Sequence, residues 1–108
     1  MHTDSHGQEF TLPGPFTSLA EVKALNFIRG YHFFNAGTMR FFDSRAAGPI
    51  YGRRLFVTSE RFEGESRRYT IRVAHDDGSI GTLGEFQQFA TLRGAATFIR
   101  HTLAEAGL

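Results

Sequence analysis

The sequence contains no cysteine, which excludes disulfide bonds, thiolate zinc sites and cysteine nucleophiles together. It also contains no tryptophan, so the large rings of a core must come from twelve phenylalanines and three tyrosines. No apolar run approaches the roughly 20 residues that span a bilayer. The polar N-terminal stretch lacks the apolar segment of a signal peptide. These absences together favour a cytoplasmic protein.

The sequence also lacks the short motifs that mark common enzyme classes. Neither an HExxH zinc motif nor a GxSxG nucleophile elbow occurs. The evenly spaced glycines of residues 78–84 are not followed by the Lys-Ser/Thr pair of a phosphate-binding loop. His2 and His6 lie near Asp4 on a polar stretch, and two imidazoles on a mobile tail make a poor metal cage. We expect no cofactor and no metal.

One group of titratable residues is a candidate for catalysis. His75 precedes Asp76 and Asp77 at the end of a predicted strand, and acid–base catalysis needs such a group with a partner in reach. The same composition is common at solvated hairpin tips. We therefore expect a protein without catalytic residues, and an enzyme that uses His75 and Asp77 is the alternative.

A chain of 108 residues, 41% of them hydrophobic, is long enough for one domain with its own core. Residues 1–16 are polar and end in a Pro-Gly-Pro sequence, which predicts a flexible N-terminal lead. Residues 17–108 are then the single folded domain.

The clearest structural signal is a pair of strands in the middle of the chain. Residues 54–62 and 67–75 are rich in Val, Ile, Thr, Tyr and Phe, and the second run alternates apolar and polar residues. The turn at 63–66 contains a glycine and joins them as a hairpin. Asp-Gly at 77–78 then predicts a tight turn into a further strand over 80–86. Its glycines mark a bulge or a close backbone approach.

Helices are predicted at both ends of this sheet. Ser18 and Glu21 match a capping box for a helix that ends at Arg29, with Leu19, Val22, Leu25 and Ile28 on its core face. Thr91 caps a last helix over 92–106. The apolar stripe of that helix is formed by Leu92, Ala95, Ala96, Ile99, Leu103 and Ala106.

Residues 38–44 fit either a fourth strand or a short helix that begins at Thr38. We favour the strand. The predicted fold is α+β, in the order α-β-β-β-β-α: an antiparallel sheet of about four strands, with the C-terminal helix packed across it and the N-terminal helix beside it.

The net charge of +1 is distributed unevenly. Residues 29–72 contain nine arginines against four acidic residues, which gives 9 − 4 = +5, and each flanking part carries −2. Such a positive centre favours an anionic partner. The alternation of the sheet places Leu55, Val57, Tyr69, Ile71 and Val73 toward the helices. Phe56, Thr58, Glu60, Thr70 and Arg72 then face the other way, beside Arg40 and Phe42.

Three interpretations of this second face stay open. In the first interpretation, the N-terminal helix covers this face, and the head groups of the arginines extend into water. Alternatively it binds another protein, because Arg and aromatic residues dominate binding hot spots, or it stacks on RNA or single-stranded DNA. We favour an interaction protein without catalysis, whose oligomeric state is open. The expected partner-binding residues are Arg40, Phe42, Arg53, Arg54, Phe56, Arg67, Arg68 and Arg72.

Four stretches carry a resemblance to known proteins: FFNAGTMRFFDSR, FVTSERF, RRYTIRV and GEFQQFATL. They resemble a family of small phage and prophage proteins of high-GC (actinobacterial-type) hosts, whose function is unknown. This resemblance implies a phage source and no catalytic activity. We expect a phage-encoded protein that acts on a host protein in the bacterial cytoplasm. A weaker likeness, from Gly48-Pro49-Ile50-Tyr51 before the strand at Leu55, is to double-stranded RNA-binding domains, and it implies RNA binding.

Overall fold

The computed structural model describes residues 1–35, 42–43 and 48–108, with the backbone alone for 42–43. Strands β3 to β6 form a four-stranded antiparallel sheet in that order, and β1 pairs with β2 in a separate hairpin. The predicted α+β fold is confirmed. The elements are β1 (His2–Thr3), β2 (Glu9–Phe10), α1 (Leu19–Ile28), β3 (Phe42–Asp43), β4 (Leu55–Glu60), β5 (Arg68–Ala74), β6 (Ile80–Leu83) and α2 (Leu92–Glu105).

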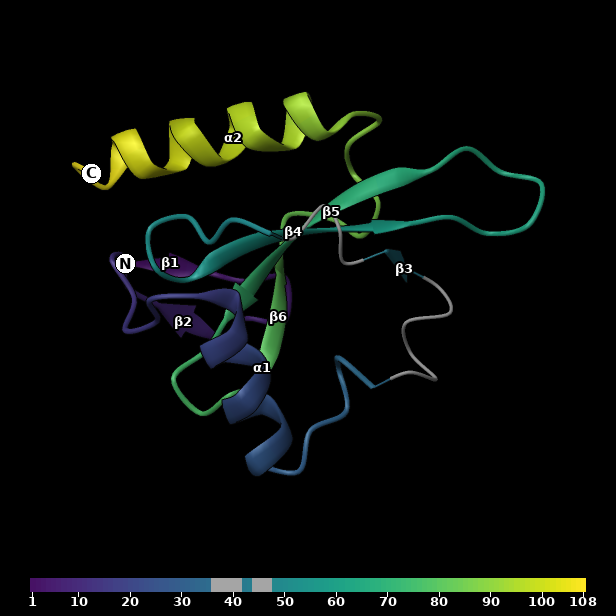
Figure 1. Cartoon of the computed structure of the whole chain (residues 1–108). Helices are drawn as coiled ribbons and strands as arrows, with labels where there is room; N and C mark the ends of the chain where they lie inside the picture. The colour runs from purple at the N-terminus through teal and green to yellow at the C-terminus, as the bar shows by residue number, and fades with distance from the viewer. Residues whose placement is uncertain (36–41, 44–47) are drawn as a thin grey trace.

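The described residues form three layers, with α2 on one face of the sheet and α1 on the other (Figure 1). The hairpin of β4 and β5 is the centre of the sheet, and it projects beyond both helices (Figure 1). Its register pairs Val57 with Ile71 and Phe56 with Arg72, so side chains alternate between the two helices. The predicted hairpin and its assignment of side chains to two faces are both confirmed.

Because each face of the sheet is covered by a helix, β4 is buried at all six of its positions. The α2 side is packed with aliphatic residues, and Ile99 of α2 is fully buried among them. Phe56 lies at the centre of the α1 side and is also fully buried. The buried residues of the α2 side are Phe10, Leu55, Val57, Ile71, Val73, Ala95 and Ile99, and those of the α1 side are Phe16, Leu19, Val22, Phe56 and Ala74.

Both helices begin at the predicted caps. The hydroxyls of Ser18 and Thr91 accept hydrogen bonds from the backbone amides of Glu21 and Gly94. The second half of the capping box is wrong, because the Glu21 carboxylate accepts from the amide and hydroxyl of Thr17 instead of reaching back to Ser18.

The predicted core face of α1 is wrong at its C-terminal end. Asn26 is buried and donates to the carbonyl oxygen of Gly78 at 2.8 Å, which ties the last turn of α1 to the β5–β6 turn through a polar contact. This contact turns Ile28 outward, and its side chain is 76% exposed. In α2, Leu92 is likewise 42% exposed, since it lies at the first position of the helix.

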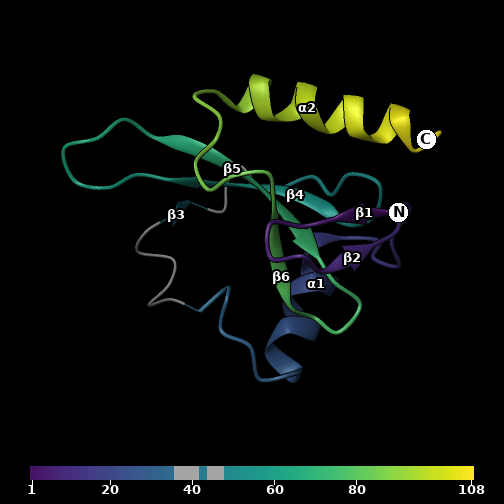
Figure 2. The ribbon, with the colours of Figure 1, turned by 180° about the vertical axis from the view of Figure 1, so that it is seen from behind.

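The predicted flexible lead over residues 1–16 is instead folded onto the sheet. Its β1–β2 hairpin lies beside β6 in both views (Figures 1 and 2), and the amide of Ser5 donates to the carbonyl of Thr82 at 2.8 Å. Phe10 and Phe16 are buried, one in each core. These two rings supply the apolar contacts that hold a segment of otherwise polar composition.

The uncertain strand at 38–44 lies mostly outside the described residues. Within it, Phe42 and Asp43 form β3 and pair with Glu60 and Ser59 of β4, as the strand alternative requires. No helix in residues 1–35 or 48–108 is long and apolar enough to cross a membrane.

Replacing Ile99 by Asp should abolish folding. The substitution places an unpaired carboxylate between α2 and the sheet at a cost of several kcal/mol, against a total stability of about 5–15 kcal/mol for a domain. Leu92→Asp is the matched control, because the exposed first turn of a helix accepts an acidic residue. Thermal melts followed by circular dichroism compare the two, and a wild-type melt for Ile99→Asp would contradict this packing.

Candidate functional site

The predicted partner-binding residues do not form one exposed surface. Phe56 is fully buried beneath α1, and Arg72 and Arg54 are also buried. Arg40 and the side chain of Phe42 lie outside the part of the chain that the structure describes. The expected Arg/Phe sheet face is therefore wrong at these three buried positions. Phe56 and Arg72 are covered by α1 and the segment that follows it, and Arg54 is covered by the N-terminal segment around Thr11 and Gly14.

Arg72 is held in a polar network inside the α1-facing side of the sheet. Its Nη2 contacts Oε1 of the fully buried Glu60 at 3.0 Å. Its Nε and Nη1 donate to the hydroxyls of Thr58 and Thr82 at 3.0 and 2.8 Å. The guanidinium carbon lies 5.3 and 5.4 Å from the ring centres of Phe33 and Phe86.

The charges of this network are balanced within the protein. Burial lowers the pKa of Arg72, while the neighbouring Glu60 opposes that shift. Glu60 also accepts hydrogen bonds from the hydroxyls of Thr58 and Thr70, at 2.5 and 2.9 Å. Instead of reaching water or a partner, Arg72 satisfies the carboxylate of Glu60.

The other predicted arginines serve separate parts of the fold. Arg53 has a positive φ of 59° and donates to the carbonyls of Pro15 and Phe16. Arg67 donates to the Ser59 hydroxyl, and Arg68 donates to the carbonyls of residues 87 and 88. Much of the arginine content is thus used in holding loops to the sheet.

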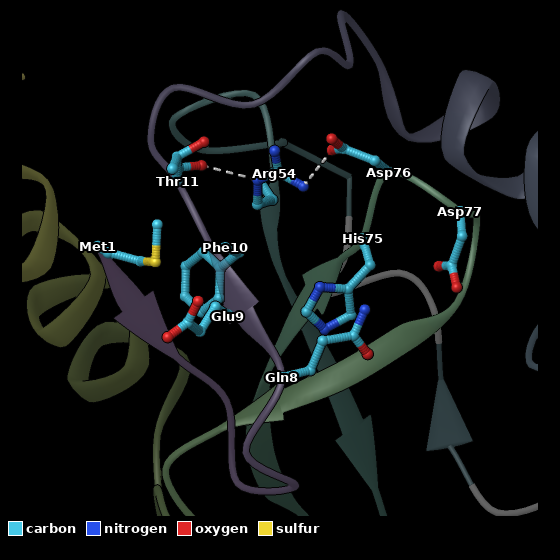
Figure 3. Close-up of a pocket in the computed structure, with 9 residues that line it drawn as sticks. All are labelled: Met1, Gln8, Glu9, Phe10, Thr11, Arg54, His75, Asp76 and Asp77. Atoms are coloured by element: carbon cyan, nitrogen blue, oxygen red, sulfur yellow. Dashed lines mark hydrogen bonds and ion pairs between the residues drawn. The ribbon is translucent and has the colours of Figure 1, made fainter.

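A cavity of about 400 Å³ lies between the N-terminal hairpin and the β5–β6 turn (Figure 3). Arg54 in its wall donates to the carbonyls of Thr11 and Ala74, both at 2.8 Å, and pairs with Asp76 at 2.8 Å. Asp76 itself is 77% exposed. The cavity is lined by Met1, Gln8, Glu9, Phe10, Thr11, Arg54, His75, Asp76 and Asp77.

His75 and Asp4 form a buried pair behind this cavity. The Nε2 atom of His75 lies 2.8 Å from Oδ2 of Asp4, and both side chains are almost completely buried. The other oxygen of Asp4 accepts the backbone amides of His6 and Gln8, each at 2.9 Å. A carboxylate from the folded N-terminal hairpin therefore meets an imidazole at the end of β5.

Gly81 of β6 is required at this place. A Cβ atom there would overlap Oδ2 of Asp4 and would lie 2.9 Å from Nε2 of His75. The predicted close backbone approach in this strand is confirmed, and the group that approaches is the His75–Asp4 pair.

The hydrogen bonds to Asp4 lower its pKa and determine which ring nitrogen of His75 donates. Burial alone would raise the pKa of Asp4, but hydrogen bonds from His75, Gln8 and His6 outweigh it, and the pKa lies below the ordinary 3.8. An ionised carboxylate only accepts hydrogen bonds, so Nε2 of His75 must donate. In the neutral imidazole, Nδ1 then carries the lone pair.

The predicted partnership of His75 with Asp77 is replaced by this pair. Asp77 accepts the amide and hydroxyl of Ser79 at 2.9 and 2.6 Å, and the hydroxyl of Tyr31 at 3.3 Å. Hydrogen bonds from Ser79 lower the pKa of Asp77. Sequence reasoning missed Asp4, because 71 positions separate it from His75 and its segment was predicted to be flexible.

A second candidate site is apolar and exposed. Phe27 and Ile28, at the C-terminal end of α1, are 79% and 76% exposed, and the nearby Tyr31 is 40% exposed. We call these three residues the α1-end surface. Among residues 1–35 and 48–108, no group of three His, Asp or Glu side chains is placed to hold a metal ion.

Residues 18–100 match a family described as "Family of unknown function (DUF7447)". The chain belongs to the DUF7447 family. The match includes α1, the sheet and most of α2, but it excludes the N-terminal hairpin that supplies Asp4. The predicted membership of a family without known function is confirmed, and no curated protein and no solved structure matches the chain.

Replacing Asp4 by Asn should weaken the fold and change its response to acid. The loss of charge-assisted hydrogen bonds should reduce the free energy of unfolding at pH 7 by about 1.5–3 kcal/mol. Because the pKa of Asp4 is lowered by folding, its contribution is complete above about pH 4 and is lost as the pH falls further.

Urea unfolding between pH 7 and pH 3 measures both effects. Asp4→Asn should lose less stability on acidification than the wild type, since it has no carboxylate to protonate at this position. Glu85→Asn is the control, because the side chain of Glu85 is exposed. Equal acid dependence in the wild type and Asp4→Asn would contradict the lowered pKa.

Proposed function

We propose that this DUF7447 protein is a non-catalytic interaction protein that binds another protein through the α1-end surface. The observation that carries the proposal is the exposure of two large adjacent apolar side chains, Phe27 and Ile28, at 79% and 76%. Aromatic residues grouped on an exposed surface are typical of protein interfaces.

The sequence of α1 supports this surface. Leu19, Val22 and Asn26 face the sheet, but the exposed side is also apolar, with Ala20, Ala24, Phe27 and Ile28 at helical spacing. Although Glu21 and Lys23 of α1 are also exposed, large apolar side chains opposite the buried side of a helix are typical of a surface that a partner covers. The sheet covers one side of α1, and the proposed partner covers the other.

Positive charges flank the α1-end surface. Lys23 and Arg29 are exposed on the same helix and its cap, and Arg29 forms no ion pair with any described residue. The proposed partner therefore presents an apolar anchor surrounded by carboxylates, since complementary charge orients such contacts. The proposed partner is therefore still anionic, as expected from the sequence, but Lys23 and Arg29 recognise it instead of the predicted arginines.

The source and compartment are part of the proposal. We propose a phage or prophage protein that acts on a host protein in the cytoplasm of a high-GC bacterium. Support comes from the resemblance of stretches such as RRYTIRV to small phage proteins. It also comes from eleven arginines against one lysine, a bias typical of GC-rich coding.

Nucleic-acid binding has less support. The expected stacking ring Phe56 is buried, and the charges of Arg54 and Arg72 are paired inside the protein. The likeness to double-stranded RNA-binding domains is also incomplete, because four strands lie between the helices instead of three.

Changing Phe27 and Ile28 together to Ser should abolish capture of one host protein from a lysate of such a bacterium. The melting temperature should stay near that of the wild type, since both side chains are exposed. The control is Leu92→Ser, which removes an exposed apolar side chain from α2. A photoreactive residue at position 27 should cross-link to the captured protein, and one at the exposed position 97 should not.

Nuclease treatment and salt separate the alternatives. Capture through apolar contacts should survive nuclease and change little between 50 and 200 mM salt. Capture that disappears with nuclease, and falls by orders of magnitude with salt, would establish a nucleic-acid partner instead. Equal capture by the wild type and the Phe27→Ser/Ile28→Ser variant would overturn the α1-end surface.

A further inference from the structure

The imidazole of His75 presents an unpartnered nitrogen to the cavity beside the N-terminal hairpin. Its Nε2 is bonded to Asp4, and Nδ1 forms no hydrogen bond with any residue that the structure describes. Every fully buried side-chain nitrogen and oxygen of the described residues has a partner. It follows that Nδ1 is not sealed off, although the side chain of His75 is only 3% exposed. In Figure 3 the ring points into the space between Phe10 and Arg54.

The wall of this cavity carries more negative than positive groups. Glu9, Asp76 and Asp77 line it, and the ionised Asp4 lies behind the His75 ring. The positive groups are Arg54, whose guanidinium is paired with Asp76 at 2.8 Å, and the amine of Met1. Glu9 is exposed and its carboxylate has no partner among the described residues.

An acceptor nitrogen within an acidic wall selects for a positively charged hydrogen-bond donor. We propose that this cavity binds a primary ammonium group, which donates to Nδ1 of His75 while the carboxylate of Glu9 balances its charge. The group can belong to a small free amine or to the lysine side chain of a peptide. The cavity borders the α1-end surface, since the hydroxyl of Tyr31 donates to Asp77 at 3.3 Å. The groups proposed to bind the ammonium, His75 and Glu9, are not part of that surface.

The cavity is built from two parts of the chain that fold together. Glu9 and Phe10 come from the N-terminal hairpin, whereas Arg54 and His75 come from the sheet. The Asp4–His75 bond holds the imidazole at the cavity wall, with Nε2 turned to Asp4. A ligand at this site would therefore contact both parts, and should stabilise their association.

The test is a titration of the ¹⁵N-labelled full chain with n-butylammonium chloride at constant ionic strength. The ring nitrogens of His75 are followed in long-range ¹H–¹⁵N spectra, and sodium chloride and sodium acetate are the reference titrants. The expected result is a saturable shift of the His75 ring signals with butylammonium alone. Glu9→Gln should weaken the binding about two- to fivefold, as the loss of an exposed ion pair does, and Glu85→Gln should leave it unchanged.

A second pair of probes identifies the source of the ammonium group. A short peptide with one lysine is compared with the same peptide whose lysine is acetylated. Binding of the lysine peptide more tightly than butylammonium assigns the site to a peptide partner, and equal binding assigns it to free amines. The proposal is overturned if the shifts grow linearly without saturation, if Glu9→Gln and Glu85→Gln bind alike, or if acetate saturates the site.

Discussion

The α1-facing side of the sheet depends on one buried pair of opposite charges, Arg72 of β5 and Glu60 of β4. Each partner alone would be an uncompensated charge in the interior, which is costly. Together, with the hydroxyls of Thr58, Thr70 and Thr82, they satisfy each other's hydrogen bonds. This network lets β4 and β5 bury polar side chains on the α1-facing side of the sheet, where the rings of Phe33 and Phe86 lie next to Arg72.

Because both faces of the sheet are covered, neither face is available as a binding surface. A sheet with one solvated face would offer arginines and phenylalanines to a partner, whereas here Arg54, Phe56 and Arg72 are interior. The features left for recognition lie at the margins: the last turn of α1, and the cavity between the N-terminal hairpin and the β5–β6 turn. The His75–Asp4 pair builds that cavity, because it joins the hairpin to the end of β5.

The sequence predicted those elements whose signals are local. The central hairpin follows from alternation and a glycine turn, and both helices begin at hydroxyl caps that bond within three residues. The α2 stripe was correct at Ala95 and Ile99, since a regular amphipathic period specifies which side is buried. The resemblance to a family of unknown function was also confirmed.

Predictions failed where the deciding contact joins distant segments. A polar lead containing Phe10 and Asp4 gives no sign that β5 ends in an imidazole placed to receive it. The direction of Ile28 depends on a bond from Asn26 to a turn 52 residues away. The excess of arginines in the middle of the chain wrongly predicted that Arg54 and Arg72 are free to bind a partner. In the folded protein each of them is paired with a carboxylate.

The central claim, that Arg72 and Glu60 compensate each other inside a sheet covered on both faces, is tested most directly by a double-mutant cycle. Urea unfolding is measured for the wild type, Arg72→Met, Glu60→Leu and the double variant. Each single change should cost about 3–5 kcal/mol, and the double variant should be more stable than either single variant, because no buried charge is left alone. A double variant whose loss equals the sum of the two single losses would contradict the account.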